Sequence, residues 1–455
     1  MKRRQFLKRT GLAGAGLGLT LTNPMGVLTR NVMAADVGDT RRKKMIFMFQ
    51  RGGNDGLNTV IPRGDADYST NTRPTLYIPE DLALDLGNGF AQLHPRMAPM
   101  MDIYNNSGLN GVDGPGNLAV LHRVGYSGQS RSHFSSQQYW ENGLPGNDGL
   151  EEGIFYRYLT NQYDFNDKNN SFLAAAISNN QMVALKGKEA IPNFSQAEDF
   201  RFPGSSGQAR KLLGSLPVDG KGGKGLLGLY GGSHDLADKR YRSLVHGTGE
   251  LLGATMEVLQ NAVDQGPYTP ANGAEYTNNS FGEKLEQCAM LLKRTDVKVL
   301  GVNIGGWDNH NNQGQINGRH GDLLYQVARG FQSLYLDLQD MWDDLIIVTM
   351  TEFGRTSREN DSRGTDHAEA TTMFIAGGGV KGGVYNCDAS SWESGAMFQR
   401  NNRYLSHKSD FRSVFGEIFM NHFGVDEDLM DSIIPAYSIA RIDDPNEFRP
   451  LGLFS

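Results

Sequence analysis

Six short runs of uninterrupted apolar residues recur along the chain, separated by stretches with helical periodicity. The apolar runs are 43–49, 117–124, 172–178, 297–304, 345–350 and 371–377. Runs of this length with apolar residues at every position are typical of strands in a sheet that is covered on both faces. The pattern therefore predicts a buried central sheet built from these six runs.

Three segments carry apolar residues at helical spacing. They are 281–294, 319–342 and 409–424, the last of which opens on Ser409 as the predicted N-cap. Strands that alternate with helices favour right-handed crossovers and a mostly parallel sheet with helices on both faces. We therefore predict an α/β fold that forms a single domain over 43–455, with a Gly-rich insertion near 201–235.

The N-terminus has the pattern of an export signal. The basic start KRRQFLK at 2–8 is followed by a short apolar stretch at 11–22 and by small residues near Ala35. The Arg-Arg pair within KRRQFLK resembles the twin-arginine export signal. We predict a cleavable signal over 1–35, a twin-arginine translocase as the partner during export, and a periplasmic or secreted mature protein. The apolar stretch is too short and Gly-rich for a stable membrane span, and no other segment reaches spanning length.

Composition narrows the class of partner and leaves the state of the cysteines open. Lys and Arg number 44 against 51 Asp and Glu, which gives a net charge of −7 and argues against a nucleic-acid partner. Hydrophobic residues make up 38 % of the chain and charged residues 21 %, as in globular proteins. Cys288 and Cys387 can form one disulfide or remain two buried thiols.

Polar side chains capable of chemistry gather where the predicted strands end. Ligands of parallel α/β sheets bind beyond the carboxyl ends of the strands, so residues that follow the strands are expected to meet there. The candidates are Arg51 and Asp55 after the first strand, Ser130, Ser132 and His133 after the second, Asp308 and His310 after the fourth, Glu352 and Arg355 after the fifth, and Asp366 and His367 before the sixth.

Several of these candidates are suited to binding a metal. Asp308, His310 and His367 offer a carboxylate and two imidazoles, which suit a divalent transition metal. The Asp-x-His spacing places both side chains on one side of an extended segment. Asp55 and Glu352 would hold a second cation or share the first.

Other candidates are suited to catalysis. Ser130 or Ser132 would lie near the start of a helix, whose free N–H groups attract an oxyanion. Metal coordination would lower the pKa of such a serine and make it a nucleophile. Arg51 or Arg355 would clamp a phosphate or sulfate through two hydrogen bonds.

Each candidate also has a structural explanation that the sequence leaves open. Asp55 in GGNDG suits a turn, and His310 in DNHNNQ suits a surface loop. Glu352 can pair with Arg355, and the serines can cap a helix.

Five ordered motifs resemble one protein family. The motifs are RGGNDGLNTVIP, SRSHFSSQQYWENG, GGWDNH, TEFGRT and GTDHAEA. Together they resemble the secreted bacterial family catalogued as domain of unknown function 1501, over roughly residues 43–425. Members of that family commonly carry twin-arginine signals. The family looks like a distant branch of the alkaline phosphatase and sulfatase superfamily. That resemblance implies an α/β sandwich and two metals, often zinc, beside a Ser, Thr or formylglycine nucleophile.

The resemblance implies roles motif by motif. The implied metal ligands are Asp55, Asp308, His310, Glu352 and His367. Glu352-Phe353 stands where the superfamily has Asp-His, so one imidazole is missing. The resemblance thus implies a divalent metal, zinc, with a second metal position left open. His133 resembles the histidine that phosphomutase-type members carry a few residues after their Ser or Thr.

We therefore expect an exported metal-dependent hydrolase that acts on a phosphate or sulfate ester, either a small molecule or a polymer. One alternative is a catalytically degenerate envelope protein that binds a metal, an anion or a surface polymer. Another is a structural or assembly protein of the envelope. Phe353, in place of an imidazole, is the residue that favours the degenerate alternative.

Overall fold

The computed structural model describes residues 42–105, 116–165, 167–200, 214, 224–225 and 240–454. The predicted signal at 1–35 lies outside the described residues, as does most of the predicted Gly-rich insertion near 201–235. Both therefore stay predictions, as does the single-domain organisation. Within the described ranges, no helix combines the length and the apolar character that crossing a membrane requires.

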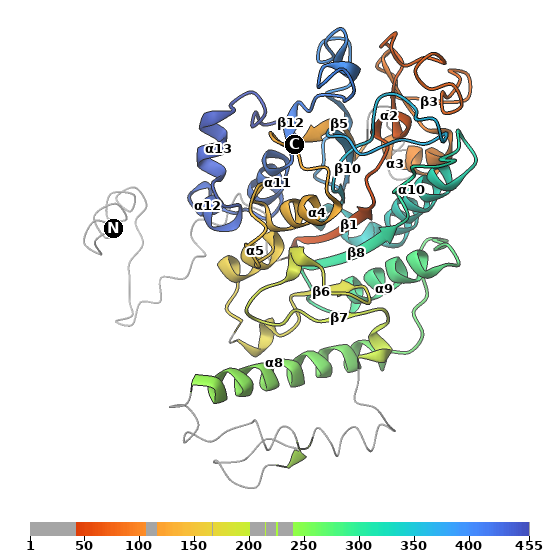
Figure 1. Ribbon diagram of the computed structural model, residues 1–455. Coiled ribbons are helices and arrows are strands. Elements are labelled where there is room, and N and C mark those ends of the chain that lie inside the picture. Colours follow the sequence, from red (N-terminus) through yellow and green to blue (C-terminus); the bar gives the residue numbers. More distant parts are fainter. Residues whose placement is uncertain are drawn as a thin grey trace, which may run out of the picture. The chain divides into compact units, whose positions relative to one another are not determined.

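A mostly parallel sheet of nine strands forms the centre of the described part of the chain (Figure 1). In spatial order its strands are β11 (Gly383–Tyr385), β5 (Leu118–Gly125), β10 (Thr371–Ala376), β9 (Leu345–Thr351), β1 (Lys44–Arg51), β8 (Val299–Gly305), β6 (Ala174–Ile177) and β7 (Asn193–Phe194), while β12 (Ser409–Asp410) pairs with β5. All six apolar runs of the sequence form strands of this sheet. The predicted mixed α/β class is thereby confirmed.

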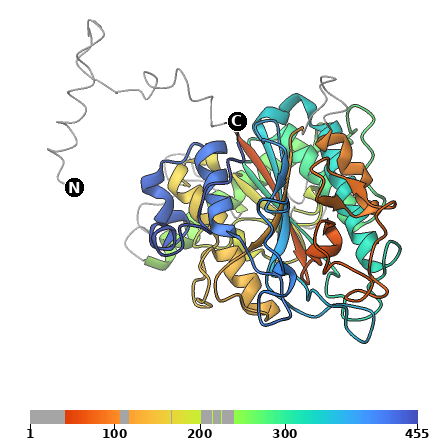
Figure 2. The same cartoon turned by 90° about the horizontal axis from the view of Figure 1, so that it is seen from above.

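The alternation of side chains along β1 explains why the sheet is covered on both faces. Ile46 and Met48 belong to one apolar core, and Met45, Phe47 and Phe49 to the other. The first core contains residues of η3 (Pro95–Met100), α3 (Met101–Tyr104), α8 (Arg240–Val263), α9 (Ser280–Arg294) and α10 (Arg319–Asp337). The second core contains residues of α4 (His133–Asn142), α5 (Ile154–Gln162), α11 (Phe411–Glu417), α12 (Met430–Ile433) and α13 (Tyr437–Asp443). Figure 2 shows helices on either side of the sheet.

A small second sheet lies beyond the end of β1. It consists of β2 (Val60–Pro62), β4 (Ala91–Leu93) and β3 (Leu84–Asp85), which pair in that order and are all antiparallel. The short helix α2 (Gly56–Thr59) connects β1 to this sheet.

β10 runs antiparallel to both of its neighbours, β9 and β5. The other pairings of the large sheet in the described residues are parallel. The start of β10 therefore lies at the carboxyl ends of the other strands. Asp366 and His367 precede β10, and this reversal is what brings them to the edge where the residues after β1, β8 and β9 emerge.

Two predicted helix boundaries differ from the structure. α10 ends at Asp337, and a 3₁₀ turn over Gln339–Asp344 leads into β9. The helix predicted to open on Ser409 begins at Phe411, because Ser409 and Asp410 both pair with β5 in β12, and the side chain of Asp410 provides the cap. Asp and Ser cap helices equally well, and here the cap is the residue that directly precedes the helix.

The two cysteines contribute to core packing. Cys288 and Cys387 are both buried in the first core and unpaired. Burial raises the pKa of both thiols, so neither is a reactive thiolate at neutral pH.

The loops after β1 and β8 meet because of a glycine. Gln50, near the end of β1, lies opposite both Ile304 of β8 and Thr351 of β9, so the three strands end together. Gly52 has a φ of +124°, and a Cβ at this position would lie 2.4 Å from the backbone nitrogen of Asp308. Only glycine accepts this conformation and this close approach without strain.

A buried ion pair fixes the loop after β1. Asp55 accepts hydrogen bonds from Arg73 Nη1 at 2.6 Å and Nη2 at 3.1 Å, and both side chains are buried. Arg73 also donates from Nε to the Ser357 carbonyl at 3.0 Å and from Nη2 to the Thr356 carbonyl at 2.9 Å. The pair therefore joins the loops that follow β1 and β9.

Arg73→Met is expected to lower the free energy of unfolding by about 3–5 kcal/mol, because it leaves the Asp55 carboxylate buried without its cation. Chemical denaturation followed by circular dichroism measures this loss. Removing both charges, as Asp55→Leu with Arg73→Met, should recover most of it. A single variant as stable as the parent would contradict a structural role for the pair.

Four buried histidines are neutral in the folded protein. Burial lowers the pKa of His94 and His422 to about 4, and that of His122 and His320 to about 3. Unfolding returns each imidazole to its ordinary pKa of 6.5, so below that pH the unfolded chain binds protons that the folded chain does not. Their contribution to stability is complete above pH 6.5 and is lost as the pH falls toward the folded pKa values.

The free energy of unfolding should therefore fall by roughly 1 kcal/mol for each of these histidines when the pH is lowered from about 7.5 to about 5.5. Urea denaturation at the two pH values measures the change. His422→Asn, which removes one of the four groups, should reduce the change by about a quarter. Equal stability at both pH values would contradict the neutral buried state.

Candidate metal centre

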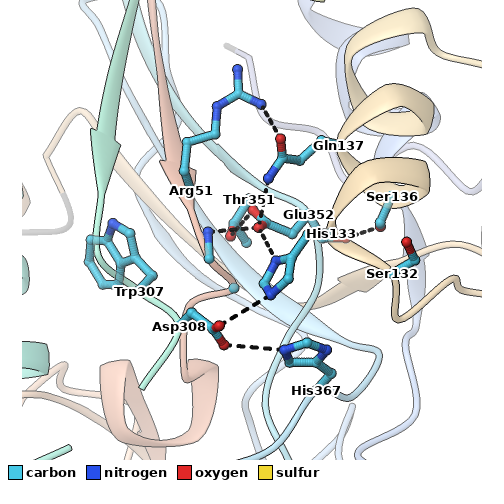
Figure 3. A network of polar contacts seen from close by, with 12 residues as sticks. Arg51, Ser132, His133, Ser136, Gln137, Trp307, Asp308, Thr351, Glu352 and His367 are labelled. Carbon is cyan, nitrogen blue, oxygen red and sulfur yellow. Dashed lines mark hydrogen bonds and ion pairs between the residues drawn. The ribbon is translucent and has the colours of Figure 1, made fainter. Parts of the chain in front are cut away.

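Three histidines converge on one carboxylate at the carboxyl edge of the sheet. Nε2 of His310 lies 3.0 Å and Nε2 of His367 lies 3.2 Å from Asp308 Oδ1. Nε2 of His133 lies 3.4 Å from Asp308 Oδ2, so this carboxylate contacts both His133 and His367 (Figure 3). The Nε2 atoms of His310 and His367 are 3.0 Å apart. We call these four residues the histidine cluster.

The histidine cluster is assembled from three separate parts of the chain. His133 is the first residue of α4, and Asp308 and His310 lie in the loop after β8. His367 lies before β10. Of the residues that the sequence predicted as metal ligands, the structure brings Asp308, His310 and His367 together, and it adds His133.

An oxygen acceptor at Nδ1 orients each imidazole of the cluster. The three pairs are His133 with Glu352 Oε1 at 2.8 Å, His310 with Asp366 Oδ1 at 3.0 Å, and His367 with the Arg131 carbonyl at 2.9 Å. These oxygens only accept hydrogen bonds, so each Nδ1 carries a proton. In a neutral ring, each Nε2 then presents a lone pair to Asp308.

This arrangement of lone pairs fits a divalent cation. Nε2 of His133 is buried and makes no hydrogen bond among the described residues. Ligand atoms of His133, Asp308 and His367 all lie within 4.8 Å of one another. Three imidazoles and one carboxylate are donors that zinc and related metals prefer. Acceptors at Nδ1 are the partners that metal-binding histidines commonly have.

Arg355 fixes the position and charge of Asp308. Its guanidinium is buried and donates to the carbonyls of Gly52, Gly53, Trp307 and Thr365, and to Asp308 Oδ1 at 2.6 Å. Burial alone would raise the pKa of Asp308, but the hydrogen bond and charge of Arg355 outweigh it and hold the pKa at about 2. Arg355, predicted as an anion clamp, is therefore engaged within the protein.

Glu352 supports His133 and lies behind the cluster. Its Oε1 accepts hydrogen bonds from the Gly52 N–H at 2.7 Å, from Gln137 Nε2 at 3.1 Å and from His133 Nδ1. The hydrogen bond to Glu352 raises the pKa of His133. Gln137 is one helical turn beyond His133, and this i, i+4 spacing was the signal in the sequence that both side chains share a face of α4.

Two predicted site residues are engaged elsewhere. Asp55, predicted as a metal ligand, is held by Arg73 and accepts from Gln313 Nε2 at 2.6 Å. Burial would raise the pKa of Asp55, but Arg73 and Gln313 lower it, so the carboxylate stays ionised and its charge is balanced by Arg73. Arg51, predicted as an anion clamp, forms two hydrogen bonds with Glu141 at 2.7 and 3.0 Å. No signal in the sequence identified Arg73 or Glu141 as partners.

The predicted nucleophiles Ser130 and Ser132 lie just before α4. Ser132 is its exposed N-cap, its side chain makes no capping hydrogen bond, and its N–H donates to Ser130 Oγ at 3.2 Å. Within the described residues, neither hydroxyl hydrogen-bonds to the histidine cluster, and Figure 3 draws no contact from Ser132 to Asp308. At the start of this helix, the residue whose side chain reaches Asp308 is His133.

The fold and the site define a mixed α/β protein with a histidine–carboxylate centre at the carboxyl edge of a mostly parallel sheet. Residues 249–398 match a family model described as a protein of unknown function, DUF1501. This range includes the cluster residues Asp308, His310 and His367, so the match supports the resemblance to that family in the part that supplies most of the cluster. A search of curated proteins finds no match to the chain.

The arrangement predicts that Glu352→Gln lowers the affinity of the histidine cluster for zinc by roughly 10- to 100-fold, because a negative charge at Nδ1 makes an imidazole a better metal ligand. Competition against a chromophoric chelator measures this affinity. Glu417→Gln is the matched control, because Glu417 is also buried and accepts backbone N–H groups of Gly452 and Leu453 away from the cluster. Equal losses of affinity in the two variants would contradict the role given to Glu352.

Proposed function

We propose that the protein is an exported metal-dependent hydrolase of the alkaline phosphatase and sulfatase type, which acts on a phosphate or sulfate ester. The observation that carries this proposal is the convergence of three imidazole Nε2 atoms on the Asp308 carboxylate, with Nδ1 of each ring held by an oxygen. The five family-like motifs supply the expectation of ester chemistry.

The proposed ligands of a single divalent metal are His133, Asp308, His310 and His367. Zinc is the metal that the resemblance implies, and when bound it would act as a Lewis acid toward an ester oxygen. The protein contributes a fixed geometry: Arg355 keeps Asp308 ionised and in place, and Glu352 keeps the proton of His133 on Nδ1.

We propose a single metal because the residues expected to hold a second one, at positions 353 and 55, offer no free ligand atoms. Phe353 stands where the superfamily has a histidine, and its buried ring lies 4.9 Å from His133 and 4.7 Å from His367 between ring centres. Asp55, the expected first aspartate of such a site, is paired with Arg73. The apolar ring of Phe353 and a carboxylate already paired with an arginine offer no free ligand for a second cation.

The same proposal includes two further points. One is export by the twin-arginine translocase to the periplasm or beyond, and the other is an alkaline-phosphatase-like sandwich fold. The basic start at 2–8 and the apolar stretch at 11–22 support export. The mostly parallel sheet between two helix layers supports the sandwich.

A catalytically degenerate envelope protein that binds a metal or an anion is the second candidate. It is favoured by the engagement of both predicted anion clamps within the protein, Arg51 by Glu141 and Arg355 by backbone carbonyls. It is also favoured by the absence, among the described residues, of a hydrogen bond from the Ser130 or Ser132 hydroxyl to the cluster.

Protein purified without chelator should carry about one equivalent of divalent metal, as expected for one four-ligand site. Elemental analysis of the parent, Asp308→Ala and His367→Ala should show the metal lost in both variants and retained in the control His407→Gln. A panel of aryl phosphates and aryl sulfates then separates the candidates. Turnover that depends on the metal supports the hydrolase, and bound metal without turnover supports the degenerate protein. A parent without metal would contradict the proposed centre.

A further inference from the structure

Three exposed arginines border the histidine cluster. Arg131 lies just before α4, and Arg400 and Arg403 lie in the turn that precedes Tyr404. Their side chains are 42, 49 and 53 % exposed, respectively. The guanidiniums of Arg131 and Arg403 lie 4.9 and 5.7 Å from the centre of the Tyr404 ring. We call Arg131, Arg400 and Arg403 the arginine rim.

Two members of the arginine rim are linked to imidazoles of the cluster, Arg403 through the Asp366 carboxylate and Arg131 through its own backbone carbonyl. Asp366 accepts from Arg403 Nη2 at 2.8 Å and from His310 Nδ1 at 3.0 Å. The backbone carbonyl of Arg131 accepts from His367 Nδ1 at 2.9 Å. Arg131 and Arg403 therefore adjoin two of the three histidines, and Arg400 shares Glu369 with Arg131.

The protein uses only a small part of the hydrogen-bonding capacity of the rim. Arg131 donates from Nη1 and Arg400 from Nε, both to Glu369. Arg403 donates from Nη2 to Asp366. Each guanidinium has five N–H donors, so most of the donors on these half-exposed side chains remain for solvent or a ligand.

The guanidiniums of the rim outnumber the carboxylates that accept their hydrogen bonds. Three guanidiniums face two carboxylates, and Asp366 is further shared with His310 and Asn360. A third carboxylate nearby, Glu447, is paired with His407 at 2.9 Å. Like charges held this close repel one another, and a bound anion relieves that repulsion.

We propose that the arginine rim binds a second anionic group of the substrate, next to the ester group at the histidine cluster. The substrate is then a polyanion: an ester that carries a neighbouring sulfate, phosphate or carboxylate. The identity of the reacting ester rests on the proposed function, whereas anion binding by the rim rests on the arginines alone. The exposed rim thus takes the recognition role that the buried Arg355 and the paired Arg51 cannot fill.

Isothermal titration of the full chain with sulfated disaccharides tests this inference. A trisulfated disaccharide should bind roughly tenfold more tightly than a monosulfated one, because only the former reaches the rim with a second anion. The difference should shrink as salt is raised, because ions screen the exposed guanidiniums. Parallel titrations with a sugar bisphosphate and a sugar dicarboxylate identify which second anion is preferred.

Arg400→Gln and Arg131→Gln should each weaken binding of the trisulfated disaccharide by roughly tenfold and leave that of the monosulfated one nearly unchanged. Arg400→Lys, which keeps the charge and loses the planar fork, should recover part of the loss. Arg441→Gln is the control, because Arg441 on α13 is 47 % exposed and makes a comparable ion pair with Glu427. It should bind like the parent.

Equal affinity for the two disaccharides, or an equal loss in Arg441→Gln, would overturn the inference. Metal content is measured on the same samples, so that a failure of anion binding by the rim can be told apart from a failure of the proposed function. A parent that holds metal but shows no preference for the trisulfated ligand overturns the rim alone. A parent without metal whose preference still depends on Arg131 and Arg400 supports the rim and overturns the metal centre.

Discussion

The buried guanidinium of Arg355 holds the candidate site together. Arg355 follows β9, and its acceptors lie in the loop after β1, in the loop after β8 and in the segment before β10. One side chain therefore joins four neighbouring strand ends. A buried cation is tolerated only when its donors are satisfied, and no other side chain has enough donors for these acceptors. The position of Asp308, and through it the whole cluster, depends on this set of hydrogen bonds.

The charges near the cluster differ in role according to their burial. Arg355 and Glu352 are buried and support the cluster, Arg355 through the Asp308 anion and Glu352 through the His133 imidazole. Arg131 and Arg403 are exposed and keep donors available on the solvent side. A buried charge that is fully paired cannot also bind a substrate, so recognition falls to the exposed groups.

Much of the fold and part of the cluster were predictable from the sequence. The six apolar runs identify the strands, and residues after β8 and before β10 were correctly expected to share an edge. That expectation held for His367 because β10 is antiparallel, which apolar runs do not reveal. Asp55 was predicted as a metal ligand because it follows the first strand; its buried partner, Arg73, is 18 residues away and carries no local signal. Whether the side chain of Ser132 or that of His133 faces Asp308 depends on the exact start of α4, which the periodicity of the sequence cannot resolve.

X-ray absorption at the zinc edge, measured on the zinc-loaded protein, tests most directly whether His133, Asp308, His310 and His367 bind the metal. The proposed ligand set predicts three imidazole nitrogens at about 2.0–2.1 Å and one carboxylate oxygen at about 2.0–2.2 Å, with the multiple-scattering pattern of histidine rings. His133→Ala should remove one of the three imidazoles. A spectrum with only water or carboxylate oxygens, or one that His133→Ala leaves unchanged, would contradict the proposed ligand set.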